Sequence, residues 1–369
     1  MTPEVELLLC CARLKLDEAR ISQLKSLVSQ EIQWDRVLTV ANRHGLMPLV
    51  YWHVTATVPT AVPATLREAF HAHAKQNLFL SGELVKILCH LDSTGVRAIA
   101  FKGPVLAETL YGNLALRQFD DLDIVIDQRD FDRARNALHE IGLFPPTNTD
   151  SRTIVRCDYE CSFAPADNSY FMEVQWAFAP PYFPLRLTPD DLWTRLEPIT
   201  FANSTIATFR REDLVLLLCL HGAKHLWGRL EWITTVAELM HQPLDWDAIR
   251  KQTTTLGCDR IVRLGTHLAT SVLDAPMPDD FRADPLIKAI ATDIQENMFC
   301  DSARISPLTM CRFHMRVRER FLDRIRHACR FLLYPTLNDV QTLWLPTPLF
   351  PIYGIVRPFR LLLKYGTQG

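Results

Sequence analysis

The sequence lacks the cysteine spacings that indicate a zinc site. It contains 10 cysteines, but they are scattered and no Cys-x-x-Cys pair of the zinc-binding type occurs. The start of the chain does not resemble a signal peptide, and no internal repeat or low-complexity tract is present. We therefore expect a globular protein of the reducing cytoplasm.

An excess of charge of one sign and a membrane-spanning run are missing too. The chain has 40 Lys and Arg against 42 Asp and Glu, so any attraction to nucleic acid or anionic lipid must come from a local patch. The most apolar long segment, residues 342–363, contains four prolines and two arginines, which argue against a spanning helix. We expect this segment to dock on the protein's own surface, with peripheral membrane contact as the alternative.

The composition is that of an ordinary globular protein. The 369 residues are 48% hydrophobic and 22% charged, which is enough for a packed core and for two or three domains. Apolar residues spaced three and four apart predict helices at both ends of the chain. Between them the period changes and predicts strand, helix, strand and helix, over residues 96–103, 104–114, 120–127 and 128–142.

These patterns divide the chain into three parts. Residues 1–95 form an N-terminal helical region, residues 96–205 a core, and residues 206–369 a C-terminal helical domain. Within the last part, the nearly apolar residues 212–240 predict one long helix buried in a bundle.

Residues 117–127, RQFDDLDIVID, predict a strand with one apolar and one acidic face. Side chains alternate along a strand, so Asp121, Asp123 and Asp127 share a face. Same-face neighbours lie only about 7 Å apart, so two carboxylates there repel each other and favour a cation between them. We expect Asp127, farther along, to end the strand or cap the next helix.

A further acid lies in a later strand. Residues 151–176 predict two strands joined by a loop around residues 164–169, and Glu173 lies in the second strand. Two acids on one strand and a third on a neighbour form an oxygen-ligand set suited to Mg²⁺. Two such ions, about 3.5–4 Å apart, can activate a hydroxyl and stabilise a leaving phosphate oxygen. The alternative is structural, with the aspartates capping a loop or pairing with Arg117.

Three segments in one order resemble the uncharacterised nucleotidyltransferase family of the polymerase-beta-like superfamily. They are FKGPVLAETLYGNLALRQFDDLDIVID, MEVQW and LCLHGAKHLWGRLEWITTVAEL, within a resemblance over roughly residues 30–240. The resemblance implies an α+β protein, with a small mixed-sheet nucleotidyltransferase core flanked by N- and C-terminal helical regions. It also implies an enzyme that uses Mg²⁺, in a two-ion site, to transfer a nucleoside monophosphate from an NTP, with ATP expected, and that releases pyrophosphate.

The resemblance assigns candidate site residues. It makes Asp121 and Asp123 the metal-binding pair and Glu173 the third carboxylate. Lys102 and Gly103 lie at the turn where the superfamily usually has Gly-Ser, so the lysine and the N–H groups of the following helix start would hold the triphosphate. For Lys102 the alternative is a solvated loop lysine.

Other positions depart from the family pattern or stay open. Arg117 would pair either with nucleotide phosphates or, structurally, with Asp120 and Asp121. Asp120 stands where the family commonly has a small residue, and its role is unexplained. Gln175 replaces a usual histidine and Thr235 an expected aspartate. These departures keep a second function open, a non-catalytic nucleotide-binding or scaffolding protein with the same fold.

The segment HGAKH places His221, Lys224 and His225 on one face of a helix. Two histidines four apart suit zinc, but the glutamate of the HExxH motif is missing. The remaining alternatives are a buried histidine pair and a site role. In the site role, Lys224 contacts nucleotide phosphate and His221 or His225 orients or deprotonates the acceptor.

Four arginines near the C-terminus recur every four residues and would form a drifting basic stripe on a helix. They are Arg312, Arg316, Arg320 and Arg324. The stripe is either a solvated face or a docking surface for an acidic partner, tRNA or another nucleic acid. The acceptor itself stays open among a small molecule, a peptide or protein, and RNA.

Overall fold

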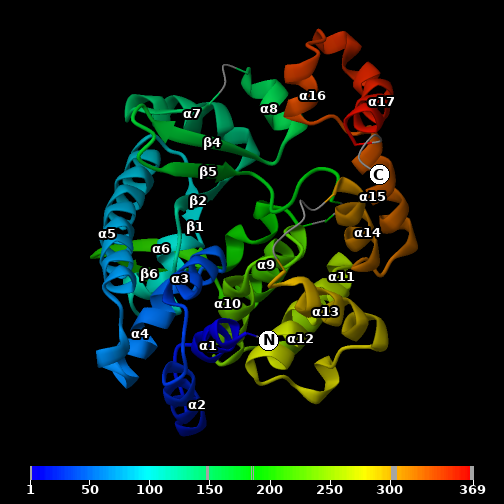
Figure 1. Cartoon of the computed structure of the whole chain (residues 1–369). Helices are drawn as coiled ribbons and strands as arrows, with labels where there is room; N and C mark the ends of the chain where they lie inside the picture. Colours follow the sequence, from blue (N-terminus) through cyan, green and yellow to red (C-terminus); the bar gives the residue numbers. More distant parts are fainter. Residues whose placement is uncertain (1, 147–148, 184, 186, 301–305, 366–369) are drawn as a thin grey trace.

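The computed structural model describes residues 2–146, 149–183, 185, 187–300 and 306–365. In this part of the chain, a five-stranded mixed sheet lies beside a large group of helices formed by both ends of the sequence (Figure 1). The α+β class expected from the resemblance is thus confirmed.

The N-terminal region is helical, as predicted. Its helices are α1 (Pro3–Cys11), α2 (Glu18–Val28), α3 (Trp34–Arg43), α4 (Met47–Thr57) and α5 (Ala64–Ser93). Asp17 begins α2 by accepting a hydrogen bond from the N–H of Arg20, as an N-cap should. The long helix α5 runs along the sheet in Figure 1 and buries leucines against it.

The sheet has the strand order β1-β2-β5-β4-β3. Its strands are β1 (Ala98–Ala100), β2 (Asp121–Ile126), β3 (Leu143–Phe144), β4 (Glu160–Pro165) and β5 (Phe171–Gln175). Strands β2 and β5 are parallel and the other neighbours antiparallel. The connecting helices are α6 (Gly103–Thr109) and α7 (Phe131–Glu140), so the predicted order of strand, helix, strand and helix is confirmed.

Two features around the sheet differ from the sequence prediction. Residues 151–157, expected to begin a strand, form helix α8 (Ser151–Cys157), because Asp150 accepts a hydrogen bond from the N–H of Thr153 and caps it. A hairpin of β6 (Leu196–Phe201) and β7 (Ser204–Phe209) was not predicted. It joins the site region through Thr208, whose hydroxyl donates to the Ala100 carbonyl of β1 over 3.0 Å.

The long helix predicted over residues 212–240 is wrong. The chain forms α9 (Arg211–Lys224) and α10 (Leu230–Met240), separated by a turn in which Leu226 and Trp227 have positive φ. The Trp227 side chain folds back and is buried against Gly222, where a Cβ would lie only 2.5 Å from the indole ring. Burial of this ring accounts for the break in a segment whose apolar pattern is continuous.

The C-terminal part continues as helices. They are α11 (Trp246–Leu256), α12 (Asp259–Leu273), α13 (Pro285–Asn297), α14 (Pro307–Arg316), α15 (Phe321–Leu333), α16 (Leu337–Thr342) and α17 (Tyr353–Tyr365). One hydrophobic core cluster extends from Leu7 in α1 to Val317 after α14, so both ends of the chain contribute to the same interior. The division at residues 95 and 205 into separate domains stays a prediction.

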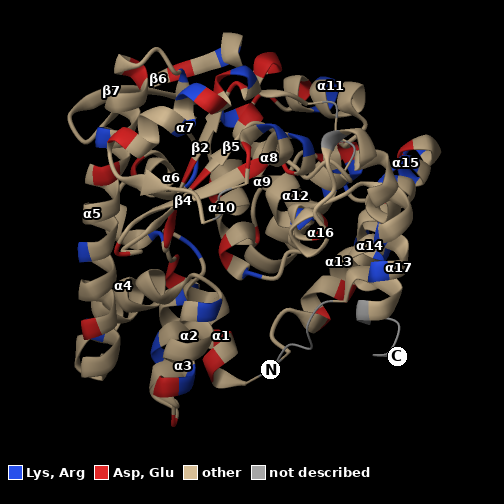
Figure 2. Ribbon diagram, turned by 90° about the horizontal axis from the view of Figure 1, so that it is seen from above, with Lys and Arg blue, Asp and Glu red and all other residues tan. Residues whose placement is uncertain are grey.

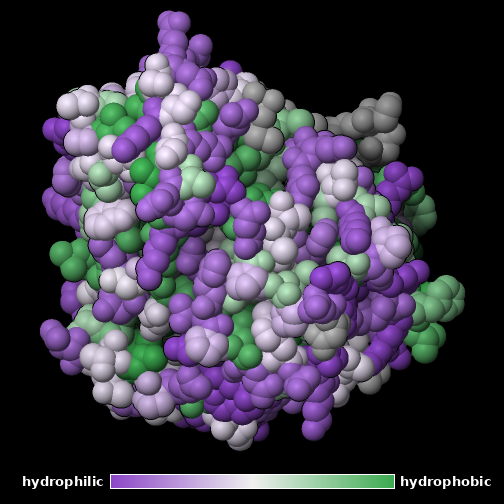
Figure 3. Space-filling view, turned by 90° about the horizontal axis from the view of Figure 1, so that it is seen from below, coloured by the Kyte–Doolittle hydropathy of each residue, from purple (hydrophilic) through white to green (hydrophobic). Residues whose placement is uncertain are grey.

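Across the described residues, we find no helix long and apolar enough to cross a membrane. The segment 342–363 docks in part, since Tyr353 is buried and Arg357 pairs with Asp339, while Trp344 and Leu363 stay exposed. The face of the molecule seen from below is mostly hydrophilic, with scattered apolar patches (Figure 3). Location in the cytoplasm stays a prediction.

Candidate active site

Strand β2 has the two faces that its sequence predicts. Leu122, Ile124 and Ile126 are fully buried and anchor the strand in the core. Asp121 and Asp123 project to the other side, and Asp123 lies in register with Glu173 of the parallel strand β5. Asp127 accepts a hydrogen bond from the N–H of Arg129 and caps the next turn, as expected.

A cavity of about 250 Å³ opens beside these acids. Figure 2 shows acidic and basic segments meeting in this region, around β2, β5 and α9. Every candidate site residue named from the sequence lines the cavity: Lys102, Gly103, Arg117, Asp121, Asp123, Glu173, His221, Lys224 and His225. Tertiary structure therefore brings together groups that are up to 123 positions apart, from residue 102 to residue 225.

Lys102 is buried and bound to one of the acids. Its Nζ donates to Asp123 Oδ1 over 2.7 Å, so the alternative of a solvated loop lysine is wrong. Burial lowers the pKa of Lys102, but the Asp123 carboxylate outweighs this effect and holds the pKa above its ordinary value. Gly103 begins α6 with φ of +47°, and a Cβ there would lie 3.4 Å from the Asp121 carbonyl. This turn is therefore packed closely against β2.

Gln175 connects two of the three acids. Its Nε2 donates to Asp123 Oδ1 over 2.9 Å and to Glu173 Oε2 over 3.2 Å, from a side chain that is almost fully buried. The departure from the family's usual histidine therefore leaves a hydrogen-bond donor between the carboxylates.

Crowding of the acids changes their protonation. Burial, together with the neighbouring Asp123 and Glu173 carboxylates, raises the pKa of Asp121 to about 7. Burial and the charges of Glu160 and Asp123 raise the pKa of Glu173 to about 7. A cation near these groups would favour their charged forms.

The donor set fits Mg²⁺ in its chemistry. Within the described ranges, no group of three or more His, Cys, Asp or Glu side chains is placed so that it could hold a metal ion without other ligands. Mg²⁺ typically binds one or two protein carboxylates and completes its shell with water and phosphate oxygens. Asp121, Asp123 and Glu173 thus suit an ion that binds together with a nucleotide.

Arg117 has a partner that the sequence analysis missed. Its Nη2 lies 2.6 Å from Oε1 of Glu231 in α10, and both side chains are buried. Of the two alternatives, the structural pairing with Asp120 and Asp121 is therefore wrong, and the phosphate role stays a prediction. Thr235, one turn after Glu231, hydrogen-bonds the Tyr111 hydroxyl over 3.0 Å and donates to the Glu231 carbonyl. The sequence signal for Glu231 was an acid inside the nearly apolar segment 212–240.

The rings of His221 and His225 lie against each other, with their centroids 4.7 Å apart. Both rings also contact Trp232. Burial and nearby Lys102 lower the pKa of His221 well below its ordinary value, and burial and Lys224 lower the pKa of His225 to about 3. Both rings are thus neutral at physiological pH. No described side chain joins them in a metal-binding group, which argues against the zinc alternative.

Lys224 and its neighbours form another side of the cavity. Its Nζ donates to the Tyr159 hydroxyl over 2.6 Å, and burial lowers its pKa although the Glu160 carboxylate opposes this. Glu160 begins β4, lies opposite Gln175 in the sheet and lines the cavity. The sequence analysis did not identify Tyr159 or Glu160, although an acid at the start of a strand was the signal that singled out Asp121.

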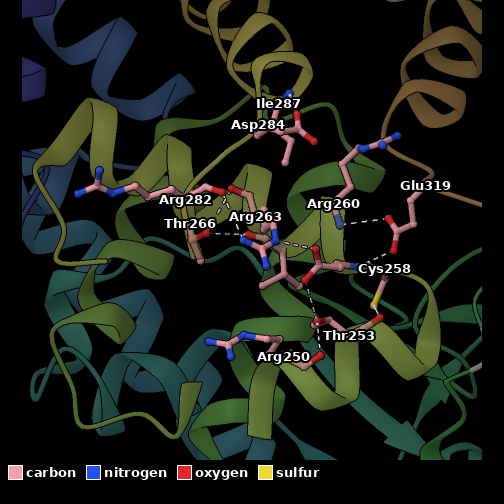
Figure 4. Close-up of polar contacts among 12 residues, drawn as sticks. Arg250, Thr253, Cys258, Arg260, Arg263, Thr266, Arg282, Asp284, Ile287 and Glu319 are labelled. Carbon is pink, nitrogen blue, oxygen red and sulfur yellow. Dashed lines mark hydrogen bonds and ion pairs between the residues drawn. The ribbon is translucent and has the colours of Figure 1, made fainter. Parts of the chain in front are cut away.

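The arginine stripe does not form on one helix. Helix α14 ends at Arg316 and α15 begins at Phe321, and Glu319 between them accepts hydrogen bonds from the N–H groups of Asp259 and Arg260 at the start of α12 (Figure 4). Arg316 pairs with Asp293, and Arg320 donates to the carbonyls of Thr254 and Thr255. These contacts dock the segment on the protein itself.

Comparisons with known proteins find a matching family. A family model described as uncharacterised nucleotidyltransferase matches residues 30–274. Among solved structures, the chain is similar to the solution structure of the antibiotic-resistance factor ANT(2'')-Ia, with 10% identity and a TM-score of 0.36, over 48% of this chain and 91% of that one. A search of curated proteins finds no match.

Proposed function

Because this chain belongs to the uncharacterised nucleotidyltransferase family, we propose that it transfers a nucleoside monophosphate from an NTP to a nucleophile on an acceptor. The acceptor atom forms a bond to the α-phosphorus, the bond to the pyrophosphate oxygen breaks, and the proton of the acceptor leaves to solvent. The observation that carries this proposal is the cavity at which three carboxylates meet Lys102 and Lys224.

Asp121, Asp123 and Glu173 would hold Mg²⁺. The ion, when bound, supplies charge neutralisation and orientation of the phosphate oxygens. Lys102 donates to Asp123 over 2.7 Å, and Gln175 fixes the orientation of the Asp123 and Glu173 carboxylates. The Asp123 and Glu173 carboxylates are thus oriented before the nucleotide binds.

The cationic side of the cavity would bind the triphosphate, with ATP as the expected nucleotide. Lys102, Gly103 at the start of α6, Arg117, Lys224 and His225 line this side. Glu231 holds the Arg117 side chain in place, so Arg117 would lose little side-chain entropy when its guanidinium binds the triphosphate. Neutral His221 and His225 are weak bases, and we propose that they orient the acceptor by hydrogen bonding.

The test is magnesium-dependent pyrophosphate release from each common NTP, with ATP first. The protein should bind the triphosphate more tightly with Mg²⁺ than with EDTA, and Asp121→Asn should abolish the difference. If no NTP binds in the presence of Mg²⁺, the proposal fails.

A further inference from the structure

A second cavity, of about 290 Å³, adjoins the first. Glu160, Lys224 and His225 line both cavities, so they form the wall between them. The second cavity extends away from β2, between the α8–β4 junction, residues 180–182, α14 and residues 334–336. A ligand in it would lie next to a nucleotide bound at the acids, which is the place an acceptor must take.

The second cavity is acidic. It contains the carboxylates of Asp158 and Glu160, and the lysine in its lining, Lys224, donates to the Tyr159 hydroxyl. Asp158 follows the last residue of α8, and its Oδ1 accepts a hydrogen bond from the N–H of Tyr159, which fixes the side chain at the cavity wall. Two carboxylates stand here against the single ammonium of Lys224, so the excess charge of the lining is negative and would favour a cationic ligand over an anionic one.

Aromatic side chains complete the lining. Tyr159, Tyr182 and Tyr334 contribute to the wall, together with Met310 of α14. The Tyr334 hydroxyl donates to the Arg156 carbonyl over 2.6 Å, and the Tyr182 carbonyl accepts from His327, so both tyrosines are held in place. The Lys224 ammonium already lies over the Tyr159 ring, 4.8 Å from its centroid. Tyr182 and Tyr334 are therefore the rings that could attract the ammonium group of a ligand, since aromatic faces attract ammonium groups and pack against apolar carbon.

We propose that this second cavity is the acceptor site, and that the acceptor is a small molecule carrying an ammonium group beside its nucleophilic hydroxyl or amine. The inference rests on the proposed nucleotidyl transfer, because it assigns the partner of that reaction. A lining built from several chain segments and a volume of about 290 Å³ suit a small molecule better than a folded RNA or protein.

The experiment uses the full chain with Mg²⁺ and ATP. Amino sugars and amino alcohols are compared, as acceptors and in thermal-shift binding, with their N-acetylated counterparts, which keep the hydroxyls but lose the charge. We expect modification of ammonium-bearing compounds and a decrease of at least about tenfold in kcat/KM on acetylation, the size of a lost charge-assisted contact.

The matched variants are Asp158→Asn in the cavity and Asp132→Asn on the exposed face of α7. Asp158→Asn should raise KM for the amine acceptor about tenfold and leave KM for ATP unchanged, whereas Asp132→Asn should behave as wild type. If the Asp158→Asn variant does not fold, the N-acetylated pairs still decide the question with wild-type protein.

The inference is overturned if N-acetylated compounds react equally well, if Asp158→Asn changes KM for ATP alone, or if no ammonium-bearing compound binds or reacts. Failure of ATP to bind with Mg²⁺ would instead remove the proposed function, and this inference with it. Nucleotide binding measured without acceptor therefore separates the two failures.

Discussion

Lys102 and Asp123 form a buried ion pair that connects the turn after β1 to the acidic face of β2. The pair places a positive charge among carboxylates that otherwise repel one another. We expect Lys102→Met to lower the free energy of unfolding by about 3 kcal/mol, because removing one partner leaves a buried charge uncompensated. Urea unfolding measures the change.

The exposed Lys86→Met variant is the control and should unfold like wild type. A double variant with Asp123→Asn should recover part of the loss, since position 123 then carries no charge that Lys102 would have to compensate. Equal destabilisation by Lys102→Met and Lys86→Met would contradict a structural role of the pair.

The magnesium-dependent reaction should require the carboxylates of Asp121, Asp123 and Glu173. Asp121→Asn, Asp123→Asn and Glu173→Gln should each lower pyrophosphate release at least about a hundredfold, a loss typical of a group that stabilises transition-state charge. Asp127→Asn, on the same strand face, should keep activity, because Asp127 caps the following turn and pairs with Arg129, and it does not line the cavity. Loss of activity in all four variants would show that activity depends on the integrity of the strand and not specifically on the carboxylate cluster.

Stability should depend on pH through the same acids. Asp121 and Glu173 have pKa values raised to about 7, above the values near 4 of an unfolded chain, so the metal-free fold binds more protons. Their contribution to stability is therefore complete below about pH 4 and is lost as pH rises to about 7. Between pH 5 and pH 8 the Tm of wild type should fall relative to that of Glu173→Gln.

Mg²⁺ should reverse this loss, because it favours the ionised carboxylates. Thermal melts with EDTA and with Mg²⁺ should therefore differ more at pH 8 than at pH 5, and this difference should shrink in Glu173→Gln. An equal effect of Mg²⁺ at both pH values would be inconsistent with binding at these carboxylates.

Gln175 should contribute to both stability and activity through its hydrogen bonds to Asp123 and Glu173. Gln175→Leu leaves Asp123 and Glu173 without this donor, so we expect a loss of about 1–2 kcal/mol in unfolding free energy together with lower activity. Gln175→His restores a donor and should retain more activity than the leucine variant. The exposed Gln128→Leu serves as the control, and a similar effect of both leucine variants would refute a specific role.

The turn between α9 and α10 should be sensitive to volume. Gly222→Ala places a Cβ 2.5 Å from the Trp227 ring, so we expect destabilisation of about 1–3 kcal/mol from overpacking. Gly82→Ala, in α5 with nothing within 4 Å, should instead stabilise by up to about 1 kcal/mol through helix propensity. Chemical unfolding of both variants tests the opposite signs, and a neutral Gly222→Ala would show that Trp227 can move.

Much of the site could be predicted because its signals are local. Alternation along β2 follows from strand geometry, so the sequence alone separates Asp121 and Asp123 from the buried Leu122 and Ile124. The role of Asp127 as a cap follows from the same segment. The order of the motifs along the chain indicated the family, and it needs no knowledge of contacts.

Pairings between distant segments were decided only by packing. Lys102 and Asp123 are 21 residues apart and Arg117 and Glu231 are 114 apart, and no periodicity encodes which charge meets which. The break after Lys224 depends on where Trp227 can be buried. Local periodicity determines which face of an element is apolar, but the choice of partner depends on burial and charge compensation across the whole fold, and these exist only once the elements have packed.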